Sequence, residues 1–512
     1  MDNGDSTSSY SQQMKVKTFN IYSGKLIALM NEIDAKELGI FALERVQVRN
    51  QKTGKALVVV VDLTTSMVEE NEVGLFEEAQ KILAVKNGQE VEVKAVERPE
   101  SVAFIKKKMD KQKLTAGELK AIVDDIANDR LSDIEASAFM SSVYINGFDL
   151  EEIVAMTNAL IADGRQLKFE KEFILDKHSV GGTNGRTTMI VVPIIAAAGY
   201  LIPKTSSRSI TSAAGTADSM EVLANVSLSL ERIRDITNKV GGVISWGGAV
   251  DLAPVDDKMI KLEHPLSLDP KGQVIASVMS KKASVGAKFL VIDLPVGPEV
   301  KIKSRETAEE MARDFIEVGK RVGIKVEAVL TDGDEPVGMA FGPALEAKEV
   351  METLEGKKWN ALAEKSCGLA GALFELVGRS KKGEGHRLAK EILTSGMALE
   401  KMKEIIKAQD GKILRSEDVR LARFKKEVKA KSAGEIKKIN VKKVIEIARL
   451  SGAPADKRAG VLLKVLAGES IREGQILYEI YSENTRKLDL AEKQALKSRV
   501  IDFEEVIIEE FV

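Results

Sequence analysis

A glycine- and hydroxyl-rich stretch, DKHSVGGTNGRTT (residues 176–188), stands directly before the apolar run MIVVPIIAAAG. Backbone N–H groups of a glycine-rich turn that opens a helix can converge on an anion, and the helix dipole favours negative charge there. Lys177 adds a positive charge and Ser179 adds a hydroxyl donor. The spacing is not that of a Walker A loop, because Val180 stands where its first glycine would be. The stretch predicts a phosphate-binding loop; a plain strand-to-helix turn is the structural alternative.

A second polar stretch, PKTSSRSITSAAGTADSME (residues 203–221), follows the next apolar run. It gathers hydroxyl groups around Arg208 and includes a turn of small residues at 213–215. A guanidinium and hydroxyls suit phosphate oxygens, because charge-assisted hydrogen bonds are stronger than neutral ones. A Ser/Thr-rich surface loop is the alternative. Two such stretches close together in sequence, each beside an apolar run, favour a shared anion site.

The segments around these stretches predict the elements that would position them. From about residue 173, apolar runs such as AKFLVIDLP alternate with helical stretches such as TAEEMARDFIEVGKRVG. This alternation is typical of a mainly parallel sheet covered by helices. Earlier in the chain, one helical face is predicted by Leu119, Ile122, Val123 and Ile126. Residues 14–96 alternate short β-rich runs with turn signals, which predicts a small barrel-like β domain.

A chain of 512 residues is too long for one hydrophobic core, so we predict a multidomain α/β protein. The predicted parts are a disordered N-terminus (1–13), an N-terminal β domain (14–96), a helical domain (97–172), an α/β phosphate- and nucleotide-binding domain (173–350), a helical continuation (351–417) and a C-terminal α+β domain (418–512). The alternative for the 173–350 range is that one of its helices returns to the helical domain.

Composition and charge restrict the partners. The 76 basic residues nearly balance the 78 acidic ones, so no global field attracts nucleic acid or an anionic membrane. The Lys-rich run at residues 424–443 contains Glu and lacks interleaved aromatics, which favours a solvated face over a nucleic-acid patch. The single cysteine, Cys367, cannot form an internal disulfide, and no Cys/His cluster has the spacing of a metal site. With neither a signal-like N-terminus nor a long apolar span, we expect a cytoplasmic protein without a metal.

With KHSVGG followed by KTSSRSITSAAGTAD, the chain resembles the AMP phosphorylase branch of the thymidine/pyrimidine-nucleoside phosphorylase family over nearly its whole length. The resemblance implies a helical domain facing an α/β domain across a cleft, then a C-terminal α+β domain; the AMP branch adds an N-terminal β domain. It implies phosphorolysis of nucleoside 5′-monophosphates, in which AMP and phosphate give adenine and ribose 1,5-bisphosphate. Phosphate is then a co-substrate, no cofactor is needed, and a homodimer or a larger homo-oligomer is expected.

The resemblance also implies a role for each matching residue. Asp269 would be the acid that protonates the leaving base. Phosphate would be held by Lys177, Ser179 and Thr216. The residues implied to contact the nucleotide are Gly181, Ser207, Arg208, Ser209, Ile210, Thr211, Ser212, Thr216, Ser277, Lys281 and Lys301. Lys303 lies close enough in sequence to be the alternative to Lys301.

The acid role of Asp269 has a clear chemical reason. A purine that leaves as an anion is costly, so a carboxylic acid near its ring nitrogen should deliver a proton as the C–N bond breaks. To hold its proton until then, Asp269 needs burial or a nearby carboxylate. The structural alternative is an Asx-type hydrogen bond, because Asp269 directly precedes Pro270 in an expected turn.

One motif departs from the pyrimidine enzymes. They present an arginine in a YALRD-like motif, whereas this chain has LEHPLSLDP with His264 near that place. Pyrimidine-nucleoside phosphorolysis therefore stays as the alternative function. Phosphoribosyl transfer, as in the structurally related anthranilate enzymes, and nucleotide binding without catalysis are further alternatives. AMP, CMP and UMP share the 5′-phosphate, so the preferred base stays open.

Overall fold

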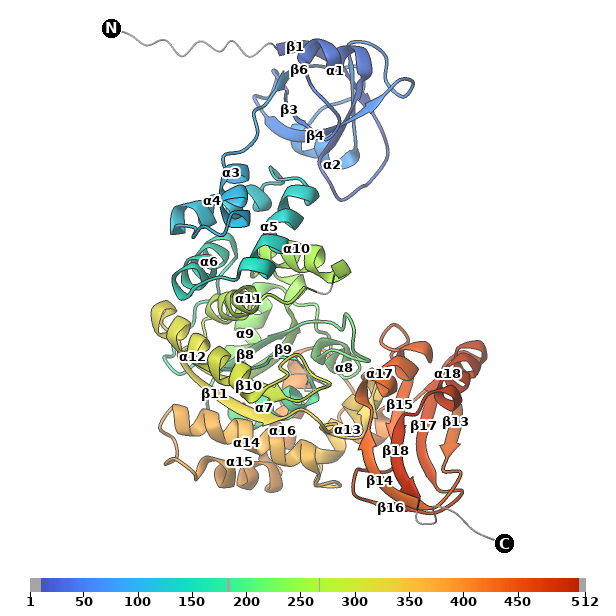
Figure 1. The fold of residues 1–512 in the computed structure, drawn as a ribbon. Coiled ribbons are helices and arrows are strands. Elements are labelled where there is room, and N and C mark those ends of the chain that lie inside the picture. The colour runs from blue at the N-terminus through green and yellow to red at the C-terminus, as the bar shows by residue number, and fades with distance from the viewer. Residues whose placement is uncertain (1–10, 182–184, 267, 506–512) are drawn as a thin grey trace. The chain divides into compact units, whose positions relative to one another are not determined.

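The computed structural model describes residues 11–181, 185–266 and 268–505. The chain divides into two compact units, the first made of Met1–Asp163 and Pro254–Val274 and the second of Gly164–Ala253 and Ile275–Val512. Most elements of each unit are labelled in Figure 1.

The first unit begins with a closed barrel of strand order β1-β5-β2-β4-β3-β6, which confirms the predicted barrel-like domain. Alternate residues of its strands, such as Val46, Val48, Val59 and Val61, fill the interior. Its elements are β1 (Ser11–Thr18), β2 (Ile27–Asn31), α1 (Glu32–Leu38), β3 (Arg45–Arg49), β4 (Ala56–Thr64), β5 (Glu72–Leu75), α2 (Glu77–Leu83) and β6 (Glu90–Ala95). Because β1 pairs from its first residue, residues 11–13 belong to the barrel and not to the N-terminal segment assigned from sequence.

The rest of the first unit is helical. Side-chain capping boxes at Thr115 and Ser132 start two of its helices. The predicted face with Leu119 and Ile122 is buried, which confirms that helix. The chain returns to this group with α10, which packs against α4, α5 and α6. The elements are α3 (Ser101–Met109), α4 (Ala116–Ala127), α5 (Asp133–Asn146), α6 (Leu150–Asp163), α10 (Pro254–Glu263) and the 3-10 turn η2 (His264–Leu266).

The second unit is built on parallel strands β7 (Leu175–Ser179), β8 (Ile202–Ser206), β9 (Gly242–Trp246), β10 (Phe289–Val296) and β11 (Lys325–Asp332). Strands pair as β11-β10-β7 and β8-β9, and a bridge between Ile174 and Leu201 joins the two sheets. The chain thus adds β8 and β9 on one side of β7, then β10 and β11 on the other. In open α/β sheets, ligands bind beyond the carboxyl ends of the strands where the order reverses. This rule points to the loops that follow β7 and β10.

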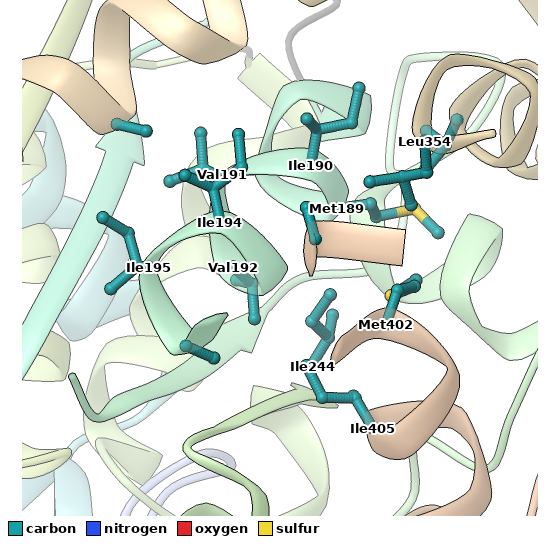
Figure 2. Packing of buried hydrophobic residues seen from close by; sticks show 14 of the residues in the cluster. Met189, Ile190, Val191, Val192, Ile194, Ile195, Ile244, Leu354, Met402 and Ile405 are labelled. Carbon is teal, nitrogen blue, oxygen red and sulfur yellow. The ribbon is translucent and has the colours of Figure 1, made fainter. Parts of the chain in front are cut away.

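The helix that follows β7 is the centre of the largest hydrophobic core. Figure 2 shows side chains of this helix, among them Met189, Val192 and Ile194, in one cluster with Leu354, Met402, Ile405 and Ile244. The predicted helical continuation therefore packs into the core of the α/β domain. The helices and 3-10 turn of this part are α7 (Gly185–Ala197), α8 (Thr216–Glu221), α9 (Leu230–Val240), η1 (Gly247–Ala249), α11 (Lys271–Ser284), α12 (Arg305–Val322), α13 (Pro343–Leu354), α14 (Ala361–Leu376), α15 (Gly385–Thr394) and α16 (Met397–Ala408).

The C-terminal part is α+β, with sheets β12-β15-β17-β13 and β16-β14-β18. Its elements are β12 (Ala340–Phe341), η3 (Ser416–Asp418), β13 (Phe424–Lys429), β14 (Gly434–Ile439), α17 (Val441–Leu450), β15 (Gly460–Leu463), β16 (Ser470–Ile471), β17 (Ile476–Ser482), α18 (Thr485–Lys497) and β18 (Ile501–Glu505). Because β12 pairs antiparallel with β15, two residues from the range assigned to the α/β domain complete the C-terminal sheet.

The Lys-rich run forms β13, β14 and the start of α17. Its Lys425 and Lys426 pair with Glu479 and Glu492 at 2.7 and 2.9 Å. This ion-paired face agrees with the predicted solvated surface. Within the described residues, no helix is both long enough and apolar enough to cross a bilayer.

Candidate functional site

The loops that follow β7 and β10 meet at Gly181. Gly181 has φ +85°, and a Cβ there would lie 2.9 Å from Cγ of Lys301. Only glycine therefore accommodates both the left-handed backbone and the Lys301 side chain that passes over it. Residues 182–184 of the predicted phosphate loop lie outside the described residues, and α7 begins at Gly185. The structure thus brings together Gly181 and Lys301, two residues predicted to contact the nucleotide.

Lys301 and Lys303 have different environments. The Lys303 Nζ donates to the carbonyl oxygen of Pro298 at 2.6 Å and to that of Val300. Lys303 therefore closes its own loop, whereas the Lys301 side chain lies against the β7 loop. The Lys301 side chain is thus the one that Gly181 accommodates.

The loop between β8 and α8 carries the second predicted cluster and adjoins the first. A Cβ at Gly215 would lie 2.6 Å from the carbonyl oxygen of Ser207, so the loop can close this tightly only with glycine. Thr216, the first residue of α8, donates its hydroxyl to the carbonyl oxygen of Gly185 at 3.1 Å. The two polar stretches predicted from the sequence therefore lie side by side, with Thr216 as the link.

Asp218 holds the β8 loop in shape. Its Oδ2 accepts the backbone N–H groups of Ser209 and Gly215 at 2.7 and 3.0 Å. Burial favours the neutral acid, but these hydrogen bonds and Lys457 outweigh burial and lower the pKa of Asp218. Arg449 of α17 also donates to the carbonyl oxygen of Ser212 at 3.1 Å. The C-terminal part of the chain therefore helps to fix this loop.

The predicted nucleotide contacts of the loop form two sets. Ser209 donates to the carbonyl oxygen of Ser212 at 2.5 Å, and the Ser212 hydroxyl donates to Ser209 Oγ at 3.0 Å. Ser207, Ile210 and Thr211 are exposed. Ser209 and Ser212 thus stabilise the turn. The three exposed residues face solvent, where a ligand can reach them.

Arg208 is paired with two carboxylates. Its guanidinium pairs with Glu221 at 2.6 and 2.7 Å and with Asp218 at 3.2 Å, and it lies 4.7 Å from the centre of the Trp246 ring. The hydrogen bonds from Arg208 help to lower the pKa of Glu221 to about 2. Sequence reasoning directed this arginine toward phosphate, but two carboxylates hold it here, because Glu221 and Asp218 both lie on the helix that ends the loop.

Lys177 lies on β7, the strand that leads into the first polar loop. It is buried on β7, and its Nζ donates to the hydroxyl of Thr187 on α7 at 2.9 Å. Burial lowers the pKa of Lys177 to about 8. Its neighbour Asp176 points to the opposite face of the strand and pairs with Lys282 of α11 at 2.7 Å and with Lys204 of β8 at 3.4 Å. Lys177 is therefore positioned as a cation whose charge depends on pH near neutrality.

Ser179 is engaged by a buried carboxylate that sequence reasoning missed. The Ser179 hydroxyl donates to Asp293 Oδ2 at 2.6 Å, in register with Asp293 across the β7–β10 pair. Asp293 is fully buried. The available signal was the single charged residue in the apolar run FLVIDLP, because an isolated charge in a buried strand requires a partner.

The remaining predicted residues lie on or before α11. Ser277 and Lys281 are half-buried and one helical turn apart on this helix. Asp269 belongs to the first unit and is exposed, so the burial expected of a catalytic acid is not seen. The Pro270 carbonyl accepts the Val274 N–H at 2.9 Å in the first turn of α11, so Asp269 lies just before this helix.

Known proteins resemble both the parts and the whole of the chain. The model of the glycosyl transferase family helical bundle domain matches residues 102–164, and that of the glycosyl transferase family a/b domain matches residues 171–399. AMP phosphorylase 1 of Archaeoglobus fulgidus is 46% identical, covering 95% of this chain and 96% of that protein. AMP phosphorylase of Methanothrix thermoacetophila is 43% identical, covering 97% and 96%.

One solved structure shows the same fold at low identity. The anthranilate phosphoribosyltransferase of Thermus thermophilus superposes with a TM-score of 0.52 at 20% identity. The match covers 60% of this chain and 99% of that one. It supports a helical bundle combined with an α/β domain.

Proposed function

This chain belongs to the AMP phosphorylase family, and we propose that it is a pentosyltransferase that cleaves AMP with inorganic phosphate to adenine and ribose 1,5-bisphosphate. The observation that supports this proposal is the junction of two polar loops at Thr216 and Gly185. The loops follow β7 and β8, strands of two sheets that the Ile174–Leu201 bridge joins, and the buried Lys177 lies on β7. CMP and UMP are further proposed substrates because they carry the same 5′-phosphate.

In the proposed reaction, one phosphate oxygen attacks C1′ of the ribose while the bond from C1′ to the base nitrogen breaks. Lys177, Ser179 and Thr216 hold the phosphate, which turns a bimolecular encounter into a positioned one. The electron pair of the broken bond goes to the base, which takes a proton from Asp269. The loop after β8 and Lys301 bind the nucleotide and keep its ribose in line with the phosphate.

The test of the proposed function is release of free base from AMP, CMP, UMP, adenosine and thymidine, each with and without phosphate. We expect phosphate-dependent release from AMP and none from adenosine, at a rate that a metal chelator leaves unchanged. Release from thymidine alone would show a pyrimidine-nucleoside phosphorylase. Release from none of the five would refute the proposal.

The lowered pKa of Lys177 predicts how phosphate use depends on pH. Below a pH of about 8 the Lys177 amine is protonated and attracts phosphate, and above that pH it loses its charge. The kcat/KM for phosphate is therefore expected to fall about tenfold per pH unit above that value. Initial rates at limiting phosphate and saturating AMP, measured from pH 6 to 10, check this. In Lys177→Met this step should disappear from the profile; a profile that keeps it would assign the step to another group.

A further inference from the structure

Asp293 sits at the centre of a hydrogen-bond chain that reaches the proposed phosphate ligand Ser179. Its Oδ2 accepts the Ser179 hydroxyl at 2.6 Å, and its Oδ1 accepts the Thr331 hydroxyl at 2.5 Å. Lys365 of α14 donates to Thr331 Oγ1 at 2.8 Å and lies 3.4 Å from Asp293 Oδ2. Three elements, β7, β10 and β11, together with α14, thus converge on one buried carboxylate.

The chemistry of these groups fixes the direction of each hydrogen bond. A lysine ammonium can only donate, and a carboxylate can only accept. The Thr331 hydroxyl therefore accepts from Lys365 and gives its own hydrogen to Asp293. The Ser179 hydroxyl likewise gives its hydrogen to Asp293. A serine hydroxyl has one hydrogen and two lone pairs, so Ser179 retains only acceptor capacity for any other ligand.

We propose that Asp293 holds Ser179 as a hydrogen-bond acceptor toward the bound anion, so that the site selects an anion carrying an O–H group, hydrogen phosphate, over sulfate. This inference rests on the phosphate role of Ser179 in the proposed function. Asp293 acts through Ser179 and is a positioning residue. The backbone supports the same arrangement, because the N–H of Val180 donates to the carbonyl oxygen of Asp293 at 2.9 Å.

The arrangement also orients the nucleophile. Hydrogen phosphate donates its O–H to Ser179, which leaves its unprotonated oxygens for Lys177 and for attack on C1′. Sulfate has a similar size and charge but carries no hydrogen at neutral pH, so one of its oxygens would face the lone pairs of Ser179. Sites built to bind a hydroxyl reject analogues that lack it, because the polar group in the site is left unpaired.

The experiment compares anions on the full-length protein. Calorimetric titration gives the dissociation constants of phosphate and sulfate, and inhibition of AMP cleavage by sulfate gives an independent value. We expect the wild type to bind phosphate about 30-fold more tightly than sulfate, because the half-buried Ser179 hydroxyl would lose its hydrogen-bond partner to the anion. Arsenate, which also carries an O–H, should replace phosphate in base release.

Three variants test the assignment. Asp293→Asn removes an obligate acceptor and Ser179→Ala removes the lone pairs, so each should reduce the preference for phosphate to within about fivefold. The matched control Thr331→Val removes one donor to Asp293 but leaves the Ser179 contact, and should keep the wild-type preference. Thermal unfolding shows which variants are folded. If Asp293→Asn does not fold, Ser179→Ala carries the test.

The inference is overturned if the wild type binds sulfate as tightly as phosphate or if it binds neither anion. It is also overturned if folded Asp293→Asn and Ser179→Ala keep the wild-type preference. Loss of preference in Thr331→Val would also contradict it, because a change that spares the Ser179 contact would then act equally. A wild type that prefers phosphate in calorimetry but releases no base from AMP would refute the proposed function and leave this inference standing.

Discussion

Replacing Asp269 by asparagine is expected to lower kcat for AMP phosphorolysis by about 100- to 10,000-fold, the usual contribution of a general acid. Asparagine keeps the shape of the side chain but cannot deliver a proton to the departing adenine. AMP binding should be little changed, because proton transfer occurs only as the C–N bond breaks. Single-turnover base release and equilibrium AMP binding, measured on the same preparations, separate the two effects.

A substrate that needs no acid provides the sharper control. An AMP analogue methylated at N7 of adenine leaves as a neutral base, so the asparagine variant should cleave it at nearly the wild-type rate. Asp235→Asn, at an exposed carboxylate of α9, should behave as wild type with both substrates. An equal loss of rate with AMP and with the methylated analogue would exclude Asp269 as the acid and assign it a structural role.

Arg186→Met is expected to lower the free energy of unfolding by about 3–5 kcal/mol, because it leaves a buried carboxylate without its cation. Arg186 is fully buried at the start of α7, and its Nη1 donates to Glu349 Oε2 at 2.9 Å and to the carbonyl oxygen of Ala340. Its guanidinium also lies 5.1 Å from the centre of the Phe341 ring. Nearby, burial raises the pKa of Glu346 to about 7. Denaturant unfolding, with hydrogen exchange of α7 and α13, measures the loss.

Removing both charges should restore much of this stability. The double variant Arg186→Met/Glu349→Gln leaves neither member of the ion pair without its partner, and the glutamine oxygen still accepts the backbone N–H of Met339, which Glu349 accepts at 2.7 Å. Arg387→Met removes an exposed ion pair with Glu391 and should leave the unfolding midpoint nearly unchanged. The single variant at Glu349 completes the comparison. If the double variant loses as much free energy of unfolding as the two single variants together, the two residues are not coupled and the explanation is wrong.

The sequence predicted those elements whose signal is local. Apolar spacing placed the helix around Leu119 and Ile122, and turn signals between β-rich runs predicted the barrel. Glycine needed for a left-handed backbone, as at Gly181, is also a local property. These predictions succeed because the period of a helix or strand and the shape of a turn depend on neighbouring residues.

Domain boundaries were less predictable. Residues 340–341 pair with β15, more than a hundred positions later, and the helices after residue 350 pack against α7. Such contacts are decided by which surfaces fit together after the chain folds, and a short strand such as β12 carries too few residues for a pattern of its own.

For the candidate site, the sequence by itself determined which residue types gather in two polar stretches and which family they resemble. Only the tertiary structure decided what each side chain touches. It placed Arg208 on Glu221, Lys303 on its own loop and the hydroxyl of Ser179 on Asp293. The physical reason is that a polar or charged side chain takes the nearest partner in space as it leaves water. For Arg208 and Lys303 that partner lies in the same loop or the helix after it, whereas the pairing of β7 with β10 brings Asp293 to Ser179 from a distant part of the chain.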